Sequence, residues 1–506
     1  MKLKTSVQAY GTSLLVAMEA MMLFVLSSCG AATSPITPVV ANLPNPSIAQ
    51  NTAPVTVGAY SNFPGTPTPN GIFTSVTVCT PEVYPVGQNP ISGPPPAPTC
   101  QTINNILVDT SSVGLRLLHA GLNPLPVVTD SSQHPLFECV QFADLSYTWG
   151  PVMMATVQMA GETAAQVPAP LIPPSGYVPV TPNTGIPIQV IATPNDILNG
   201  SIVGVEGLNI ALPAAPSDCL SSPPSGALPI AANSMGTLGA NGILGIGAFQ
   251  QDCDASCASS TPPNQYYYCP SGVCAAASVA QNLQLWNPVA AFAYDNNGVL
   301  LSLPNSPPSN GSASMTGSLT FGIGTQSNNA LGRASIYPVD AYGNFPQVTL
   351  TYTDINAEYP SVFLNYLSPQ NGSYIDSSSP AIYFSDSNSL GPTIPNCTDY
   401  TAYYCPGYEE YPSLKVFGAP VPDLLGTVTT QGTVNFNVVS ADALLSSGNS
   451  VFADLGGASG VGPTTDYVDL GVPFFLGHNV FVGFAGTALL NPDQQVVNYP
   501  SGYWAF

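Results

Sequence analysis

The stretch ILVDTSSVGLRLL, residues 106–118, decides the fold. Its apolar start, Ile106 to Val108, has the character of a buried strand and leads to a single aspartate, Asp109. Three hydroxyl residues follow before the chain becomes apolar again: Thr110, Ser111 and Ser112. Serine, threonine and aspartate are common turn residues that hydrogen-bond their own backbone. The pattern therefore predicts a turn that holds a carboxylate at the end of a buried strand.

A second stretch, IDSSSPAI at residues 375–382, repeats the order of the first: apolar, Asp, Ser or Thr, Ser, Ser, two small or apolar residues and an aliphatic residue. Each stretch is followed later by an element of two apolar residues and a glycine. We assign these elements to Ile243-Leu244-Gly245 and Phe475-Leu476-Gly477. Two motifs in the same order in both halves predict an internal duplication.

The duplicated pattern resembles the pepsin-like aspartic peptidases, whose two β-lobes each contribute one Asp-Thr/Ser-Gly loop. It is also similar to an uncharacterised group of bacterial lipoproteins that look pepsin-like. The stretches that carry this similarity are FADLSYTWGPV (142–152), TFGIGTQSNN (320–329) and GVPFFLGHNVFVG (471–483). The resemblance covers roughly residues 70–506. It implies an all-β, two-lobed pepsin-like β-barrel architecture with a central cleft.

Composition agrees with this fold class. The chain has 506 residues with 54 prolines and 46 glycines, which disfavour long helices, so we expect few short ones. Many short runs of Val, Ile, Thr, Tyr and Phe are bounded by turn residues, as strands are. A proline-rich patch at 302–314 is placed between the halves, which gives an N-terminal lobe over 61–314 and a C-terminal lobe over 315–506.

The resemblance makes Asp109 and Asp376 the candidate catalytic pair. Two carboxylates within hydrogen-bonding distance share a proton, because like charges prevent both from ionising cheaply. The ionised acid takes a proton from water, and the neutral acid donates one to a peptide carbonyl. If the chain is active, it is expected to be an aspartic endopeptidase. Asp386, in FSDSNSLG, is a competing second acid, but the apolar run after Asp376 matches the first half better.

Four hydroxyl residues receive supporting roles from the same resemblance. Thr110 and Ser377 are expected to cross-link the two loops, while Ser112 and Ser379 are expected to bond the carboxylates. The alternative is that all four are ordinary turn residues.

The stretch after Asp109 also contains a candidate flap, a hairpin that would cover the substrate. Tyr147 is the candidate ring and Trp149 the alternative; both are equally compatible with core aromatics on a hairpin.

Ser111 and Ser378 depart from the pepsin pattern, because active relatives carry glycine there. If the backbone required a positive φ, serine would add strain of about 1–3 kcal/mol. Three functions therefore stay open. The chain is an acid endopeptidase, a catalytically inactive pseudo-peptidase that binds extended peptides or other polymers, or a structural surface lipoprotein.

The N-terminus predicts export. Lys2 and Lys4 precede an apolar stretch and the sequence LSSCG at 26–30, which resembles a bacterial lipoprotein signal. We expect a signal peptide over 1–28, lipidation of Cys29 and a flexible tether over 29–60. This implies an outer-membrane lipoprotein of the cell envelope, facing the periplasm or the surface, with the membrane as one partner and a peptide or protein ligand as another. An ordinary secretory peptide is the alternative.

Ten cysteines remain beyond Cys29, which predicts disulfides in an exported chain. Near neighbours suggest Cys79–Cys100, Cys397–Cys405 and a knot among the four cysteines from 253 to 274, for which zinc is the rival interpretation. The three histidines show no metal-ligand spacing, so neither metal nor cofactor is expected. The net charge of −22 excludes nucleic-acid binding, which needs a basic surface; beyond residue 28 the basic side chains are Arg116, Arg333 and Lys415.

Overall fold

Strands form most of the regular structure, as the proline and glycine content predicts. Five helices occur among the described residues, and each spans only four to six residues: α1 (Pro194–Asn199), α2 (Met235–Leu238), α3 (Asp254–Cys257), α4 (Ala441–Leu445) and α5 (Val472–Phe475). Short 3-10 turns are η1 (Val205–Gly207), η2 (Pro270–Gly272), η3 (Gln281–Leu283) and η4 (Val289–Ala291). The all-β class is confirmed. None of the helices in the described part has the length and apolar character to span a membrane.

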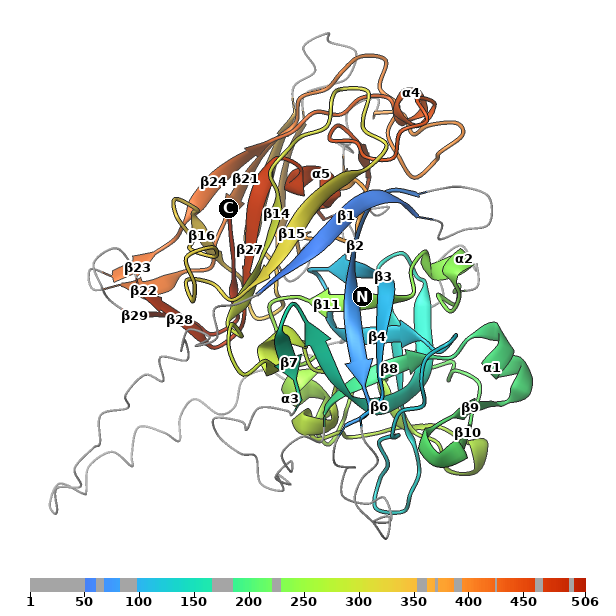
Figure 1. Ribbon diagram of the computed structural model, residues 1–506. Coiled ribbons are helices and arrows are strands. Elements are labelled where there is room, and N and C mark those ends of the chain that lie inside the picture. Colours follow the sequence, from blue (N-terminus) through green and yellow to red (C-terminus); the bar gives the residue numbers. More distant parts are fainter. Residues whose placement is uncertain are drawn as a thin grey trace, which may run out of the picture. The chain divides into compact units, whose positions relative to one another are not determined.

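The computed structural model (Figure 1) describes residues 51–60, 68–81, 98–165, 185–220, 229–352, 362–368, 372–385, 394–423, 426–459, 467–490 and 496–506. The expected signal peptide, Cys29, the first part of the expected tether and Asp386 lie outside these ranges.

One large sheet runs through both halves of the chain (Figure 1). Among the described residues its strand order is β13 (Ala275–Ala276), β12 (Tyr266–Tyr268), β5 (Leu136–Gln141), β6 (Tyr147–Met159), β8 (Ile186–Ile191), β4 (Val113–Leu118), β11 (Gly242–Ile246), β3 (Cys100–Asp109), β2 (Thr68–Cys79), β1 (Thr52–Tyr60), β15 (Met315–Phe321), β14 (Gly298–Leu303), β27 (His478–Gly483), β30 (Tyr503–Ala505) and β16 (Ile336–Pro338), with β7 (Glu162–Ala164) paired to β6.

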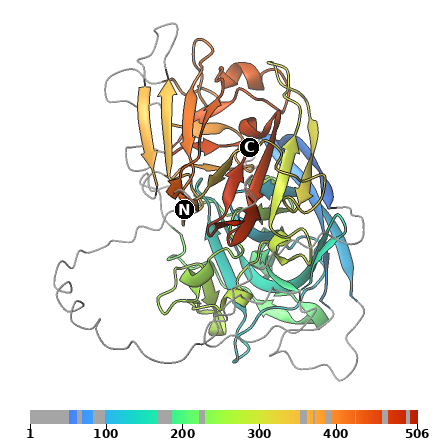
Figure 2. The ribbon, with the colours of Figure 1, turned by 90° about the vertical axis from the view of Figure 1, so that its left-hand side faces the viewer.

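Smaller sheets complete the structure. The second half holds a sheet of β18 (Val362–Leu367), β17 (Gln347–Tyr352), β21 (Ser413–Phe417) and β24 (Gln431–Asn435), whose colours run from golden yellow to orange in Figure 2. A second sheet there consists of β19 (Tyr374–Ile375), β26 (Asp469–Leu470), β20 (Ile382–Phe384) and β25 (Gly456–Ala458). The two-stranded sheets are β9 (Ser201–Val203) with β10 (Asn209–Ala211), β22 (Val421–Asp423) with β23 (Gly426–Val428), and β28 (Thr487–Leu490) with β29 (Val496–Tyr499).

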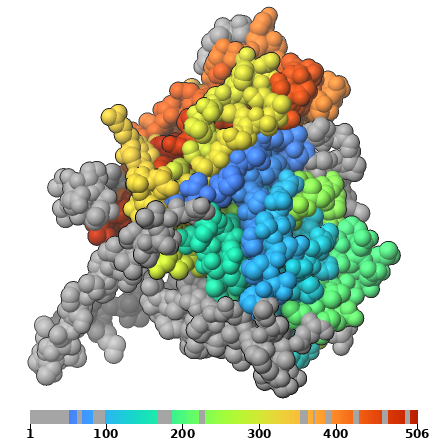
Figure 3. Space-filling model, viewed as in Figure 1, coloured from blue at the N-terminus to red at the C-terminus, as the bar shows by residue number. Residues whose placement is uncertain are grey.

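Strand β1 corrects the expected tether. Residues 52–60 were assigned to the flexible segment, but they pair with β2 on one side and β15 on the other. Ala53, Val55 and Val57 are buried at every second position, the period of a half-buried strand. Figure 3 shows this segment (blue) against β14 and β15 (yellow). The expected lobe boundary at 314/315 falls in the connection between β14 and β15, which pair with each other.

A crossing motif occurs once in each half. In the first, β11 lies parallel to β3 and antiparallel to β4, with Leu244 opposite Val108. In the second, β26 lies parallel to β19 and antiparallel to β20, with Leu470 opposite Ile375. All four residues belong to one hydrophobic core cluster. Each crossing supports the turn that carries an aspartate.

The register corrects one sequence assignment. The counterpart of Ile243-Leu244-Gly245 is Asp469-Leu470-Gly471, because these residues occupy the strand beside the second aspartate loop. Phe475-Leu476-Gly477 instead lies at the end of helix α5 and leads into β27. The apolar residues of FFLG resemble those of the first half, but the strand that lies beside the second loop carries an acid, Asp469, at the equivalent position.

Five disulfides are present in the described part of the chain, which confirms the prediction that these cysteines form disulfides. The pairs Cys79–Cys100 and Cys397–Cys405 are confirmed. The four cysteines from 253 to 274 form two neighbouring bridges, Cys253–Cys257 and Cys269–Cys274, and the fifth pair is Cys139–Cys219.

Candidate active site

The two aspartates of the duplicated motif occupy matching places. Asp109 is the last residue of β3, and Asp376 follows directly after β19. Both side chains are buried: Asp109 is 3% exposed and Asp376 is 7% exposed. A buried carboxylate is costly unless donors surround it, so the contacts of each loop determine what these acids can do.

Reciprocal hydrogen bonds join the two loops. The Thr110 N–H donates to Ser377 Oγ at 3.1 Å, and the Ser377 N–H donates to Thr110 Oγ1 at 3.0 Å. Each hydroxyl then donates to a carbonyl of the opposite loop, Thr110 to Ile375 at 3.2 Å and Ser377 to Val108 at 2.7 Å. The structure thus brings together Thr110 and Ser377, which lie 267 positions apart in the sequence.

The electrostatics of Asp376 depend on its burial and its neighbour. Burial and the negative charge of Asp109 raise the pKa of Asp376 to about 7. Hydrogen bonds from Ser378, and from the Ser111 side chain of the other loop, act in the opposite direction because they favour the ionised form. Asp376 therefore holds its proton through the acid range while lying within the field of Asp109.

Ser111 and Ser378 sit in the loops without backbone strain, since neither has a positive φ. The Ser111 N–H and hydroxyl both donate to Asp109 Oδ1 at 2.8 Å. Ser378 repeats this geometry on Asp376 Oδ1, with both distances 2.7 Å. The serines therefore keep the backbone donor expected at this position and add a hydroxyl to each acid. The strain considered from the sequence does not arise.

Ser112 and Ser379 donate to the second oxygen of each acid, but the halves differ there. The Ser112 hydroxyl donates to Asp109 Oδ2 at 2.5 Å. The Ser379 hydroxyl lies 3.2 Å from Asp376 Oδ2 and 2.5 Å from Oδ2 of a third carboxylate, Asp469. Asp469 was missed because its strand was matched to the wrong sequence; the signal available was VDLG, in which an acid stands before Leu-Gly.

The expected flap corresponds to the hairpin of β5 and β6, whose turn spans 142–146. Trp149 packs in the core: it stacks on Phe137 at 5.1 Å, and its indole N–H donates to the Pro213 carbonyl. Tyr147 is half-buried at the start of β6. The turn residue Asp144 lies close enough to raise the pKa of Tyr60 and Tyr467, which Asp376 also raises.

Five tyrosines lie near Asp376 or Asp469 or pack on a tyrosine that does, and sequence analysis did not find them. They are scattered over some 400 positions and have no common motif. We call them the tyrosine group: Tyr60, Tyr374, Tyr383, Tyr403 and Tyr467. Tyr374 stacks on Tyr467 and Tyr383 on Tyr403, with ring centroids 5.9 and 6.4 Å apart. Burial raises the pKa of all five, so the group supplies neutral hydroxyls beside the carboxylates.

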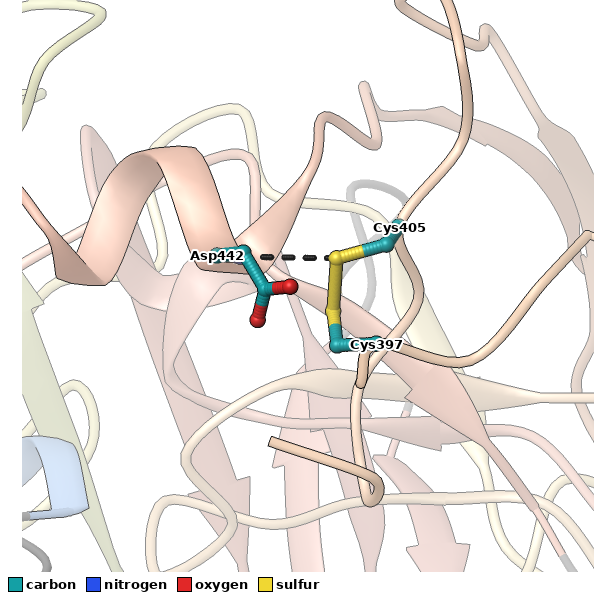
Figure 4. Close-up of side chains that lie close together, drawn as sticks. All are labelled: Cys397, Cys405 and Asp442. Carbon is teal, nitrogen blue, oxygen red and sulfur yellow. Dashed lines mark hydrogen bonds between the residues drawn. A yellow bond between two sulfur atoms is a disulfide. The ribbon is translucent and has the colours of Figure 1, made fainter. Parts of the chain in front are cut away.

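One group of side chains in the described part has the composition of a metal site: Cys397, Cys405 and Asp442, whose ligand atoms lie within 4.8 Å of one another. Figure 4 shows that the two sulfur atoms are bonded to each other, and the Asp442 N–H donates to Cys405 Sγ at 3.4 Å. Metals bind the thiolate, which a disulfide lacks. The contacts explain this group as a bridge next to the start of α4.

Comparisons with known proteins place the chain in a family without an assigned activity. A family model described as "Protein of unknown function (DUF3443)" matches residues 47–210 and 208–506. A search of the curated proteins finds no match. Among solved structures, the crystal structure of Basic 7S globulin from soybean is similar, with 11% sequence identity, 90% of this chain and 96% of that chain covered, and a TM-score of 0.36.

Proposed function

The chain belongs to the DUF3443 family of proteins of unknown function, and we propose that it is an aspartic endopeptidase in which Asp109 and Asp376 activate a water molecule. The observation that carries the proposal is the pair of buried acids on two loops that hydrogen-bond each other. Burial and then the charge of Asp109 raise the pKa of Asp376, and the second of these effects is the one expected of acids that share a proton.

The contacts suggest which acid plays which part. Asp109 accepts four hydrogen bonds from Ser111 and Ser112, an arrangement suited to a negative charge. Asp376 holds its proton below about pH 7. Asp109 then takes a proton from water as the water oxygen bonds the peptide carbonyl carbon, while Asp376 donates its proton to the carbonyl oxygen. Asp109 then passes its proton to the nitrogen as the C–N bond breaks, and Asp376 regains a proton from one of the two hydroxyls on that carbon as the C=O bond re-forms. Activity is expected in acid.

Substrate would lie beneath the β5–β6 hairpin. We assign the covering ring to Tyr147, because the Trp149 ring is already packed between core residues. Extended peptide is the substrate class, since strands pair readily with extended backbone.

A second function is favoured by one observation. The added hydroxyls of Ser111 and Ser378 each donate to an oxygen that a catalytic water would otherwise bond. If the hydroxyls take the place of that water, the same site binds extended peptides or other polymers without cleaving them. This is the pseudo-peptidase function.

Cleavage of an unfolded polypeptide between about pH 3 and pH 7 tests the first proposal. Asp109→Asn and Asp376→Asn are each expected to lower the rate by about 10²–10⁴-fold, while Asp399→Asn, at an exposed site, leaves it unchanged. Cleavage that survives either active-site substitution contradicts the acid pair. Saturable binding without cleavage, with cleavage gained by the Ser111→Gly/Ser378→Gly double variant, favours the second function.

We also propose that the chain is a lipoprotein of the cell envelope, anchored in the outer membrane through Cys29. The LSSCG sequence supports the anchor, and five disulfides are typical of an oxidising compartment. Incorporation of labelled fatty acid into the intact chain, and its loss in Cys29→Ser, is the expected result; equal labelling of both contradicts the anchor.

A further inference from the structure

Asp469 lies beside the proposed acid pair. It is the first residue of β26, where it pairs with Tyr374 of β19 and Tyr383 of β20. Its side chain is 3% exposed. Oδ2 lies 2.5 Å from the Ser379 hydroxyl, and the buried Oδ1 has no hydrogen-bond partner among the residues that the structure describes. A buried carboxylate oxygen without a donor strongly disfavours the ionised form.

Packing alone does not account for an acid here. The strand register places Asp469 where the first half has Ile243, which is 4% exposed and belongs to an apolar cluster. An aliphatic side chain is therefore sufficient for packing at this strand position. The second half carries the Asp469 carboxylate instead, and this carboxylate contacts Ser379, which also contacts Asp376.

Counting protons defines the state of this cluster. The Ser379 hydroxyl is within hydrogen-bond distance of Asp376 Oδ2 and of Asp469 Oδ2, but it has one proton to donate. Its second bond must therefore be accepted from a carboxyl that carries a proton. The proposed mechanism directs the Asp376 proton at the substrate carbonyl, which leaves Asp469 as the donor. The short distance to Asp469 fits an O–H group of that acid donating to Ser379, with the serine proton directed at Asp376.

We propose that Asp469 is a third acid of the site, a positioning residue that keeps its proton, donates it to Ser379 and so directs the Ser379 hydroxyl toward Asp376. This inference rests on the proposed function of Asp376. The two aspartates would then be hydrogen-bonded in different ways. Ser112 donates to Asp109 without a further acid, while Ser379 is itself hydrogen-bonded to Asp469.

The groups around Asp469 agree with a retained proton. Among the described residues, the titratable groups that interact with Asp469 are acids or tyrosines: Asp109, Asp376, Tyr374, Tyr383 and Tyr467. Burial first, and then the charge of Asp376, raises the pKa of Asp469 well above its usual range. A hydrogen bond donated by Ser379 would oppose that rise, whereas one donated by Asp469 supports it.

Two substitutions separate positioning from packing. Asp469→Asn keeps a donor for Ser379, and Asp469→Leu supplies the kind of side chain that Ile243 has in the first half. We expect Asp469→Asn to hold kcat/KM within about threefold of the parent, and Asp469→Leu to lower kcat by about tenfold to a hundredfold with little change in KM. A packing role predicts the reverse order, with Leu tolerated and Asn harmful, and that order overturns the inference.

Infrared spectroscopy tests the retained proton without any need for activity. At about pH 8 the spectrum of the parent minus that of either Asp469 variant is expected to show a protonated carboxyl C=O band, because Asp376 is then mostly ionised and the inference has Asp469 keep its proton. The buried Asp252 carboxyl, whose pKa is also raised, is present in all of these proteins and cancels in the difference. The same band is expected when Asp469 is substituted in the Asp376→Asn background. Absence of the band from the parent-minus-Asp469→Asn spectrum overturns the inference. If the parent cleaves nothing at any pH, the proposed peptidase fails, and this band still decides the state of Asp469.

Discussion

Ser378 gives Asp376 two hydrogen bonds on one oxygen, where glycine would give only the backbone bond. Both bonds favour the ionised carboxylate, so they oppose the rise in pKa caused by burial and by Asp109. Ser111 gives Asp109 the same two hydrogen bonds, from its N–H and its hydroxyl. At the scale of the residue, serine in this position adds a donor to the acid of its own loop and leaves the backbone unstrained.

Substitution of Ser378 by alanine should therefore shift the pH dependence of cleavage. The variant keeps the N–H bond and loses the hydroxyl bond, so the pKa of Asp376 rises further and the acid keeps its proton to higher pH. The upper limb of the pH profile of kcat/KM is expected to move up by about one pH unit. Ser75→Ala, which removes an exposed hydroxyl bonded to Asn104, is the control. A limb that stays in place or moves to lower pH contradicts the role given to Ser378.

At the scale of the element, strand register decides what the sequence could reveal. Asp109 and Asp376 were found because each lies in a local motif that the duplication repeats. Asp469 was not found, because its neighbours are set by the pairing of β26 with β19 and β20. The tyrosine group was missed for the same reason: its rings meet through pairing and loop packing between distant segments.

Strand β1 is the opposite case, because its sequence did contain a local signal for the structure that it forms. Its residues, TAPVTVGAY, were assigned to the tether because they continue a stretch rich in Ala, Thr and Pro. The alternation of Ala53, Val55 and Val57 was available as a strand signal of period two. Composition outweighed periodicity in that assignment, and pairing with β2 and β15 shows that periodicity was the better guide.

The cross-link between the loops should behave as one cooperative element. Thr110→Val removes the hydrogen-bond partner of the buried Ser377 N–H and of the Ile375 carbonyl. Ser377→Ala does the same to the Thr110 N–H and the Val108 carbonyl. Each orphaned group costs about 1–3 kcal/mol of unfolding free energy. Because both hydroxyls belong to one network, the double variant should depart from additivity by about 0.5–3 kcal/mol.

Urea unfolding of the two single variants and the double variant measures this coupling. The matched control is Thr77→Val with Thr102→Val, since these hydroxyls also bond across strands, at 2.8 Å, but are exposed. The control pair is expected to cost less than about 0.5 kcal/mol. Strictly additive losses for Thr110 and Ser377 would contradict a shared network.

At the scale of the whole molecule, acidic groups dominate. The net charge is −22, and one of the three basic side chains beyond residue 28, Arg116, is buried between Glu138 and Asp252 at 2.7 and 3.3 Å. That ion cluster lies under the first aspartate loop, because Arg116 also donates to the Val113 carbonyl. Protonation of surface carboxylates therefore relieves self-repulsion with little loss of ion pairing.

Stability should accordingly be greater in mild acid than at neutral pH. Burial raises the pKa of Asp252, Asp376, Asp454 and Asp469 in the folded chain, whereas the pKa of Asp130 is lowered at an exposed turn. An acid whose folded pKa is raised keeps its proton after the unfolded chain has lost it. Its contribution to stability is complete below the unfolded pKa and is lost as pH rises through the folded pKa.

For Asp376 the window runs from about pH 4 to about pH 7, and the change is on the order of 4 kcal/mol of unfolding free energy. We therefore expect the unfolding free energy to fall between about pH 5 and pH 7.5. Asp376→Asn should reduce that fall, because the amide cannot ionise, while the exposed Asp399→Asn should leave it as it is. A parent chain that gains stability over this range, or an Asp376→Asn variant with an unchanged slope, would show that its surroundings do not keep Asp376 neutral. The assignment of Asp376 as the acid and Asp109 as the base depends on that difference and would then fail.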